Sequence, residues 1–240
     1  MDSRQLILLL AEYIGVIAVM MIAGTSRRFQ ERRPVVFKYP FREGTISIGL
    51  FAFILILSFI IYIQYFTPIQ AADLDGQRLL IAAVSLIPFG LALMWRGQPL
   101  RSAGWSREML NPSLRVGVAL IFLTIFLSGK FMSLAGGLPR ERWMALLFWF
   151  GIALAEETLF RGYIQPRISA WLGDNYGWVA TSVMFALWQL PHLLADPHTL
   201  VIRLLLAVVQ GLVLGWIMRK SGHVMAPVMY RAISEWMRVL

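Results

Sequence analysis

Nearly the whole 240-residue chain is taken up by eight apolar stretches, each about as long as a bilayer is thick. A helix crosses the ~30 Å hydrocarbon core of a membrane with ~20 mostly apolar residues. Hydrocarbon supplies no water to bond backbone N–H and C=O groups, so each stretch is expected to be helical. We therefore predict an all-α membrane protein with about eight transmembrane helices, at Gln5–Gly24, Thr45–Thr67, Leu79–Trp95, Arg115–Met132, Trp143–Tyr163, Trp178–Leu194, Leu200–Met218 and Val224–Leu240.

Composition argues against a water-soluble domain. Hydrophobic residues make up 58% of the chain, against ~45–50% in soluble domains, and charged residues only 15%. The formal net charge of +9 would suggest nucleic-acid binding in a soluble protein. In a membrane protein such an excess more often reflects basic cytoplasmic loops. The lipid bilayer is therefore the expected partner, and no nucleic acid is expected.

Basic residues are distributed unevenly among the predicted loops. The first, third, fifth and seventh loops hold thirteen of the 22 Lys and Arg residues, and the other loops and the termini hold seven. Because cytoplasmic loops are enriched in Lys and Arg, we expect the odd loops in the cytoplasm and both termini outside. The plasma (inner) membrane is the expected location. The basic residues of the first loop are expected to face lipid headgroups and are Arg27, Arg28, Arg32, Arg33, Lys38 and Arg42.

Few residue types remain that can carry chemistry. The chain has no Cys, which excludes disulfides, thiolate metal sites and cysteine nucleophiles. Its three histidines are His192, His198 and His223. The last two are expected in loops on opposite sides of the membrane, so the three histidines cannot share one metal site. We therefore expect no metal and no other cofactor.

Several charged side chains are predicted to lie inside the membrane, where each costs at least ~2.5–3.5 kcal/mol. The fifth stretch contains Glu156, Glu157 and Arg161. Glu157 and Arg161 are four residues apart and can pair along one helix face. Glu156 points ~100° away from that face and is free to contact another group. The first stretch also contains Glu12, to which we assign no chemistry.

The segment around these glutamates resembles a known family motif. Glu156-Glu157-x-x-x-Arg161, set between Ala155 and Tyr163, is similar to the first motif of the CAAX prenyl protease and bacteriocin-processing (CPBP or Abi) family. That resemblance covers about residues 143–240 and implies a C-terminal four-helix core of the CPBP fold. Residues 1–142, with the first four helices and a basic loop at 25–44, resemble nothing in particular.

In this family an intramembrane glutamate activates water, assisted by an Arg and by histidines from two later helices. The resemblance therefore implies Glu156, Glu157 and Arg161 as site residues. The family's second motif, Phe-x-x-x-His, is matched by Phe185 and Gln189. The third, His-x-x-x-Asn, is matched by Arg231 and Glu235 after a Ser-Gly-x-x-x-Ala-Pro lead-in. Both family histidines are thus replaced.

The replacements favour a protein without proteolytic activity. Gln189 cannot titrate near neutral pH, and Arg231 cannot give up its proton. If the fifth and eighth helices meet, Arg231 pairs with Glu156 or Glu157, and the pair would lower the pKa of the glutamate and occupy its oxygens. We expect a scaffold or accessory subunit that binds another integral membrane protein or a lipidic ligand.

A second interpretation is that the chain is still an active enzyme. His192 lies three residues after Gln189, and Pro191 between them can bend the helix so that His192 turns inward. Glu156 and Glu157 with His192 would then form an active intramembrane endopeptidase, and only this alternative leaves room for a metal bound by these three residues. A transporter or channel component is a third, weaker alternative.

Overall fold

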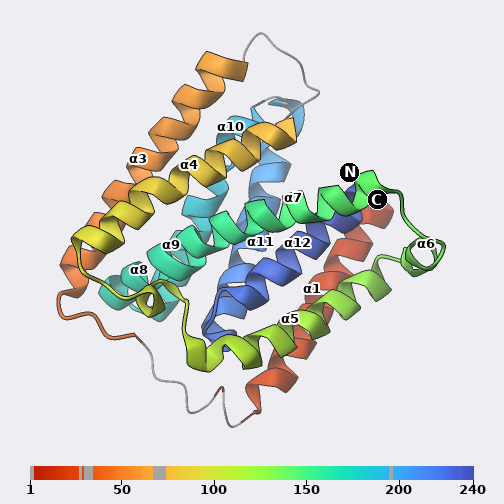
Figure 1. Cartoon of the computed structure of the whole chain (residues 1–240), viewed down its shortest axis with the longest axis horizontal. Coiled ribbons are helices and arrows are strands. Elements are labelled where there is room, and N and C mark those ends of the chain that lie inside the picture. The colour runs from red at the N-terminus through yellow and green to blue at the C-terminus, as the bar shows by residue number, and fades with distance from the viewer. Residues whose placement is uncertain (1–2, 27–28, 30–34, 67–73, 195–196) are drawn as a thin grey trace. The chain divides into compact units, whose positions relative to one another are not determined.

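The structure is a computed structural model that describes residues 3–26, 29, 35–66, 74–194 and 197–240 (Figure 1). The chain is an all-α membrane protein, and no strand occurs within those ranges. Its longer helices are α1 (Ser3–Gly24), α3 (Pro40–Phe66), α4 (Leu74–Trp95), α5 (Arg107–Leu127), α7 (Arg140–Glu157), α9 (Asp174–Trp188), α11 (Leu200–Ser221) and α12 (Met225–Val239). The shorter elements are η2 (Leu100–Ala103), α6 (Phe131–Ala135), η3 (Thr158–Ile164), α8 (Gln165–Leu172), α10 (Leu190–Leu193) and η4 (Pro197–Thr199).

Six segments of the described chain are long and apolar enough to cross a membrane. They are Ile7–Gly24, Pro40–Tyr62, Arg78–Trp95, Leu100–Leu127, Arg140–Leu172 and Leu200–Ser221. The other two predicted spans coincide with α9 and α12, which have 15 residues each. Helix α9 ends at Trp188, and the short α10 with Pro191 follows. The sequence pattern therefore located the apolar segments but overestimated the length of two helices.

The fifth span is longer than predicted. Helix α7 continues without a break into η3, a π-helical segment, and then into α8, so the apolar run extends from Arg140 to Leu172. Single π-helical turns are rare and often mark functional sites. Here the π-helix follows directly after Glu157.

The described chain forms two compact units. The first consists of residues 1–33, 105–154 and 217–240, and the second of residues 34–104 and 155–216. Each unit includes residues from before and after position 143, where the family resemblance begins. The four arginines Arg27, Arg28, Arg32 and Arg33 of the basic loop lie outside the described residues.

In the first unit, α5 packs against both α1 and α12, and the three helices lie side by side (Figure 1). Small residues allow the close approach: a Cβ on Gly117 would lie 2.5 Å from the sulfur of Met229. The buried Ser113 hydroxyl joins α5 to the start of α12, donating to the carbonyl of His223 at 3.3 Å and accepting from the N–H of Ala226 at 3.0 Å.

In the second unit, α8 packs against α3 and α9, and α3 also packs against α4 (Figure 1). Gly177 of α9 lies so close to α8 that an added Cβ would be 2.4 Å from the Cα of Ser169. Gly211 and Gly215 of α11 lie against α9 in the same way, facing Ser182 and Trp178. An aromatic cluster around Phe160 of η3 includes Phe185 of α9, with ring centroids 5.4 Å apart.

Candidate functional site

The first motif lies at the junction of α7 and η3, and its charged side chains are buried. Glu156, Glu157 and Arg161 are at most 1% exposed. The Nε of Arg161 is 3.4 Å from the Oε2 of Glu157, so the predicted pair along one helix face is present. The guanidinium of Arg161 also lies 4.9 Å from the ring centre of Phe185. The first-motif arginine and the second-motif phenylalanine are therefore in contact.

Glu156 points to a different partner, which sequence reasoning missed. The Nε of Arg78, from the first turns of α4, donates to the Oε1 of Glu156 at 3.1 Å. Its Nη2 donates to the Oε1 of Gln189 at 3.2 Å. A single guanidinium therefore connects the first-motif glutamate to the residue that replaces the second-motif histidine. Gln189 is 8% exposed, so the contact is shielded from solvent.

The sequence indicates that a second cation is needed here, but not which one. One local arginine cannot neutralise both Glu156 and Glu157, so a second cation had to come from another helix. Arg78 is 78 residues away and stands at the edge of an apolar stretch. Loop arginines are far more common than intramembrane ones, so its position favours a loop.

His192 lies beside the same ion pair, on the short helix α10. Its imidazole interacts electrostatically with both Arg78 and Glu156. Burial and, to a smaller extent, the Arg78 guanidinium lower the pKa of His192 to about 4, while Glu156 acts in the opposite direction. Its Nε2 is buried and has no hydrogen-bond partner among the described residues. His192 is therefore a neutral imidazole at physiological pH, next to the first-motif glutamate.

The third motif lies on α12, in the first unit. Arg231 is 1% exposed, so the cation that replaces the family histidine is buried. Glu235, in place of the family asparagine, pairs with Arg238, whose Nη1 is 3.4 Å from each carboxylate oxygen. Arg238 also interacts electrostatically with Glu12 and Tyr13 of α1. The intramembrane Glu12 is thus part of a charged cluster with α12.

Arg231 and the two motif glutamates belong to different compact units. The ion pair between Arg231 and Glu156 or Glu157 therefore stays a prediction. The remaining histidines are separate from these groups: His198 is exposed in η4, and His223 is buried between α11 and α12 beside the ring of Trp105. Within the described parts of the chain, no three His, Asp or Glu side chains form a group that could hold a metal ion.

A second buried polar network in the second unit was not anticipated. Glu43 of α3 is 3% exposed and accepts hydrogen bonds from Arg96 and from the Nε2 of Gln98, the latter at 3.0 Å. The Nε of Arg167 lies 3.4 Å from its other carboxylate oxygen. Arg167 also donates to the carbonyl of Tyr163 at 2.9 Å. Two guanidiniums therefore share one carboxylate, which leaves this network with a positive charge.

The C-terminal part of the chain matches a known protein family. Residues 138–237 match the family described as type II CAAX prenyl endopeptidase Rce1-like. This segment is therefore similar to the Rce1-like family, which supports the CPBP resemblance of the three motifs. No curated protein matches the chain, and no solved structure does. Arg78, Glu43 and Glu12 all precede the matched segment, so helices outside it supply charged partners within each unit.

Proposed function

We propose that this Rce1-like protein does not hydrolyse peptides and acts instead as a scaffold or accessory subunit for another integral membrane protein. The observation that carries the proposal is the bridge that Arg78 makes between Glu156 and Gln189. In a hydrolytic site, those two positions would hold the water-activating glutamate and its histidine partner.

The bridge opposes general-base catalysis for two reasons. A base must have an oxygen free to accept a proton from water and a pKa near the working pH. The Oε1 of Glu156 already accepts a hydrogen bond from Arg78. The Arg78 guanidinium also puts a fixed positive charge beside the carboxylate, where a proton taken from water would have to bind.

The residues that replace the histidines offer no substitute. Gln189 has no proton to exchange near neutral pH, and its carbonyl oxygen accepts from Arg78. Arg231 stays protonated and can neither act as a base nor bind a metal. Buried ion pairs of this kind can specify how helices pack, and we assign that role to Arg78, Glu156 and Gln189.

The experiment is gentle purification of the tagged full-length chain from its native membranes, followed by quantitative identification of co-purifying proteins. The proposal predicts one integral membrane protein in a stoichiometric amount. Glu156→Gln is nearly isosteric and abolishes any glutamate-dependent hydrolysis. No membrane peptide should change its processing in cells that carry this variant.

The active endopeptidase is kept as a second candidate because of one observation. His192 is neutral and close enough to Glu156 to interact with it electrostatically. In that case Glu156 would activate water and His192 would exchange the proton, with Glu157 and Arg161 in support. Accumulation of an unprocessed membrane peptide in both Glu156→Gln and His192→Gln cells would establish this candidate and refute the scaffold.

A further inference from the structure

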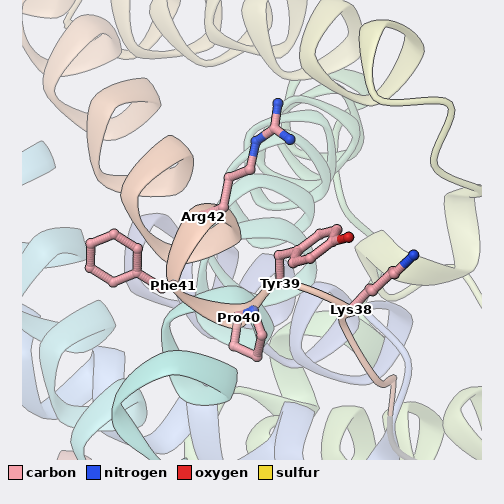
Figure 2. Close-up of a pocket in the computed structure, with 5 residues that line it drawn as sticks. All are labelled: Lys38, Tyr39, Pro40, Phe41 and Arg42. Atoms are coloured by element: carbon pink, nitrogen blue, oxygen red, sulfur yellow. The ribbon is translucent and has the colours of Figure 1, made fainter.

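A shallow hollow at the N-terminal end of α3 is not used by the proposed function. It has a volume of about 390 Å³ and is lined by Lys38, Tyr39, Pro40, Phe41 and Arg42 (Figure 2). The candidate membrane span of α3 begins at Pro40, so the hollow lies at the end of an apolar helix. Tyr39 is 54% exposed and Phe41 is 64% exposed. Exposed aromatic side chains at the end of a membrane span are typical of the headgroup region.

The hollow carries two cations that no neighbouring carboxylate of α3 neutralises. The Nζ of Lys38 lies 5.3 Å from the centre of the Tyr39 ring, so a cation–π contact holds the ammonium beside the hollow. Arg42 lies in the first turn of α3. The acidic residue of that turn, Glu43, is buried and bonded to Arg96, Gln98 and Arg167. Because that network is itself positively charged, it adds to the potential at the hollow instead of cancelling it.

Phe41 and Tyr39 have different structural roles. Phe41 packs edge-on against Trp171 of α8, with ring centroids 5.2 Å apart, and so fixes the start of α3. Figure 2 shows the Phe41 ring on one side of the chain and Tyr39 and Lys38 on the other. Tyr39 therefore presents an apolar ring and a polar hydroxyl beside the Lys38 ammonium, a combination suited to the boundary between acyl chains and headgroups.

We propose that Lys38, Tyr39 and Arg42 bind the headgroup of an acidic phospholipid. Lys38 and Arg42 would hold the phosphate, and the Tyr39 ring would contact the glycerol and the first acyl carbons. The position at the end of a membrane span favours a lipid over a free phosphate ion. Basic clusters on the cytoplasmic side attract anionic lipids, and the expected orientation puts this loop on that side. The site is independent of whether the Rce1-like domain hydrolyses peptides.

The test measures lipid binding to the purified full-length chain reconstituted in nanodiscs of defined composition. Phosphatidylglycerol is compared with phosphatidylcholine by native mass spectrometry of the lipids retained after extraction. We expect the chain to retain phosphatidylglycerol preferentially. Lys38→Ala and Arg42→Ala should each weaken that retention roughly 5-fold, and the double variant roughly 25-fold, since each basic residue contributes ~1 kcal/mol.

Arg107→Ala is the matched control, because Arg107 is also an exposed loop-side arginine but does not line the hollow. Its retention of phosphatidylglycerol should equal that of the parent chain. Equal retention of both lipids by the parent, or an unchanged preference in the Lys38→Ala/Arg42→Ala chain, would overturn the proposal. Displacement of the lipid by millimolar glycerol phosphate alone would also overturn it, because the site would then be one for free phosphate. Thermal unfolding midpoints within about 2 °C of the parent show that the variants are folded.

Discussion

At the scale of single residues, Arg78 decides how the candidate site works. Its guanidinium is 15% exposed and lies 3.1 Å from a carboxylate that is 1% exposed. Removing one partner of a buried ion pair costs more than the pair contributes, because the other charge stays buried. The contact between Arg78 and Glu156 is therefore expected to be sensitive to the loss of either partner.

We predict that Arg78→Gln destabilises the chain by about 3 kcal/mol. Glu156→Gln in the same chain should recover part of this loss, because it removes the buried charge. The measurement is the thermal unfolding midpoint in detergent of the parent, both single variants and the double variant. Together these values give the coupling free energy between Arg78 and Glu156. Arg101→Gln is the control: Arg101 is exposed in η2 of the same unit, so its loss should cost less than about 1 kcal/mol. Additive effects of the two single variants would contradict the pairing.

His223 is expected to make stability depend on pH. Burial lowers the pKa of His223 to about 4, and its Nδ1 accepts a hydrogen bond from the N–H of Met225 at 3.1 Å. The unfolded chain, with an ordinary histidine pKa of about 6.5, therefore binds a proton more readily than the folded one. This contribution is fully present above pH 6.5 and is lost as the pH falls toward 4.

The measurement is the thermal unfolding midpoint between pH 7.5 and pH 4.5. The parent should lose at least about 3 °C more than His223→Gln over this range. His198→Gln is the matched control, because His198 is exposed in η4, and it should follow the parent. Parallel curves for the parent and His223→Gln would show that the imidazole of His223 does not contribute to the pH dependence.

Sequence patterns predicted local contacts at this scale better than distant ones. The Glu157–Arg161 pair follows from a separation of four residues on a helix, and the structure contains it. The Arg78 bridge and the Glu43 network join helices far apart in the chain, and a single sequence carries no signal of which helices pack together. Glu235 pairs with Arg238, three residues away on the same helix.

At the scale of helices, close packing depends on particular glycines. We predict that Gly177→Ala destabilises the chain by about 1–3 kcal/mol, because the new methyl group would overlap the backbone of Ser169 at 2.4 Å. Gly90→Ala in α4 is the matched control, since nothing lies within 4 Å of its Cβ position. The better helix propensity of Ala should there leave stability unchanged or raise it by up to ~1 kcal/mol. If Gly177→Ala and Gly90→Ala shifted the thermal unfolding midpoint from that of the parent by the same amount, α8 and α9 would not pack this closely.

Helix boundaries followed the apolar pattern only in part. The pattern ended the fifth span near Tyr163, whereas the helical run continues to Leu172. Gln165 and Arg167 lie beyond the predicted end of the span, yet both are buried and bonded inside the protein. Polar residues that have partners in the fold cannot be distinguished from loop residues by hydropathy alone.

At the scale of the whole molecule, the expected orientation can be tested directly because the chain has no cysteine. Single cysteines at exposed Ser26, near the first loop, and at exposed Ser133, near the fourth, give two reporters. The distribution of Lys and Arg predicts that a membrane-impermeant maleimide labels Ser133→Cys in intact cells and Ser26→Cys only after the membrane is opened. The reverse pattern would invert the proposed orientation and move the phospholipid site to the other leaflet.

The central claim is that Glu156 serves an ion pair and not hydrolysis, and the Arg78→Gln/Glu156→Gln chain tests it most directly. This double variant has neither charge, so the chain should still fold, with part of its stability lost, while any glutamate-dependent catalysis is abolished. The measurement compares its co-purifying membrane partner and the processing of membrane peptides with those of the parent chain. We predict the same partner in the same amount and no change in any processed peptide. A peptide that the parent processes and the double variant leaves intact would contradict the claim.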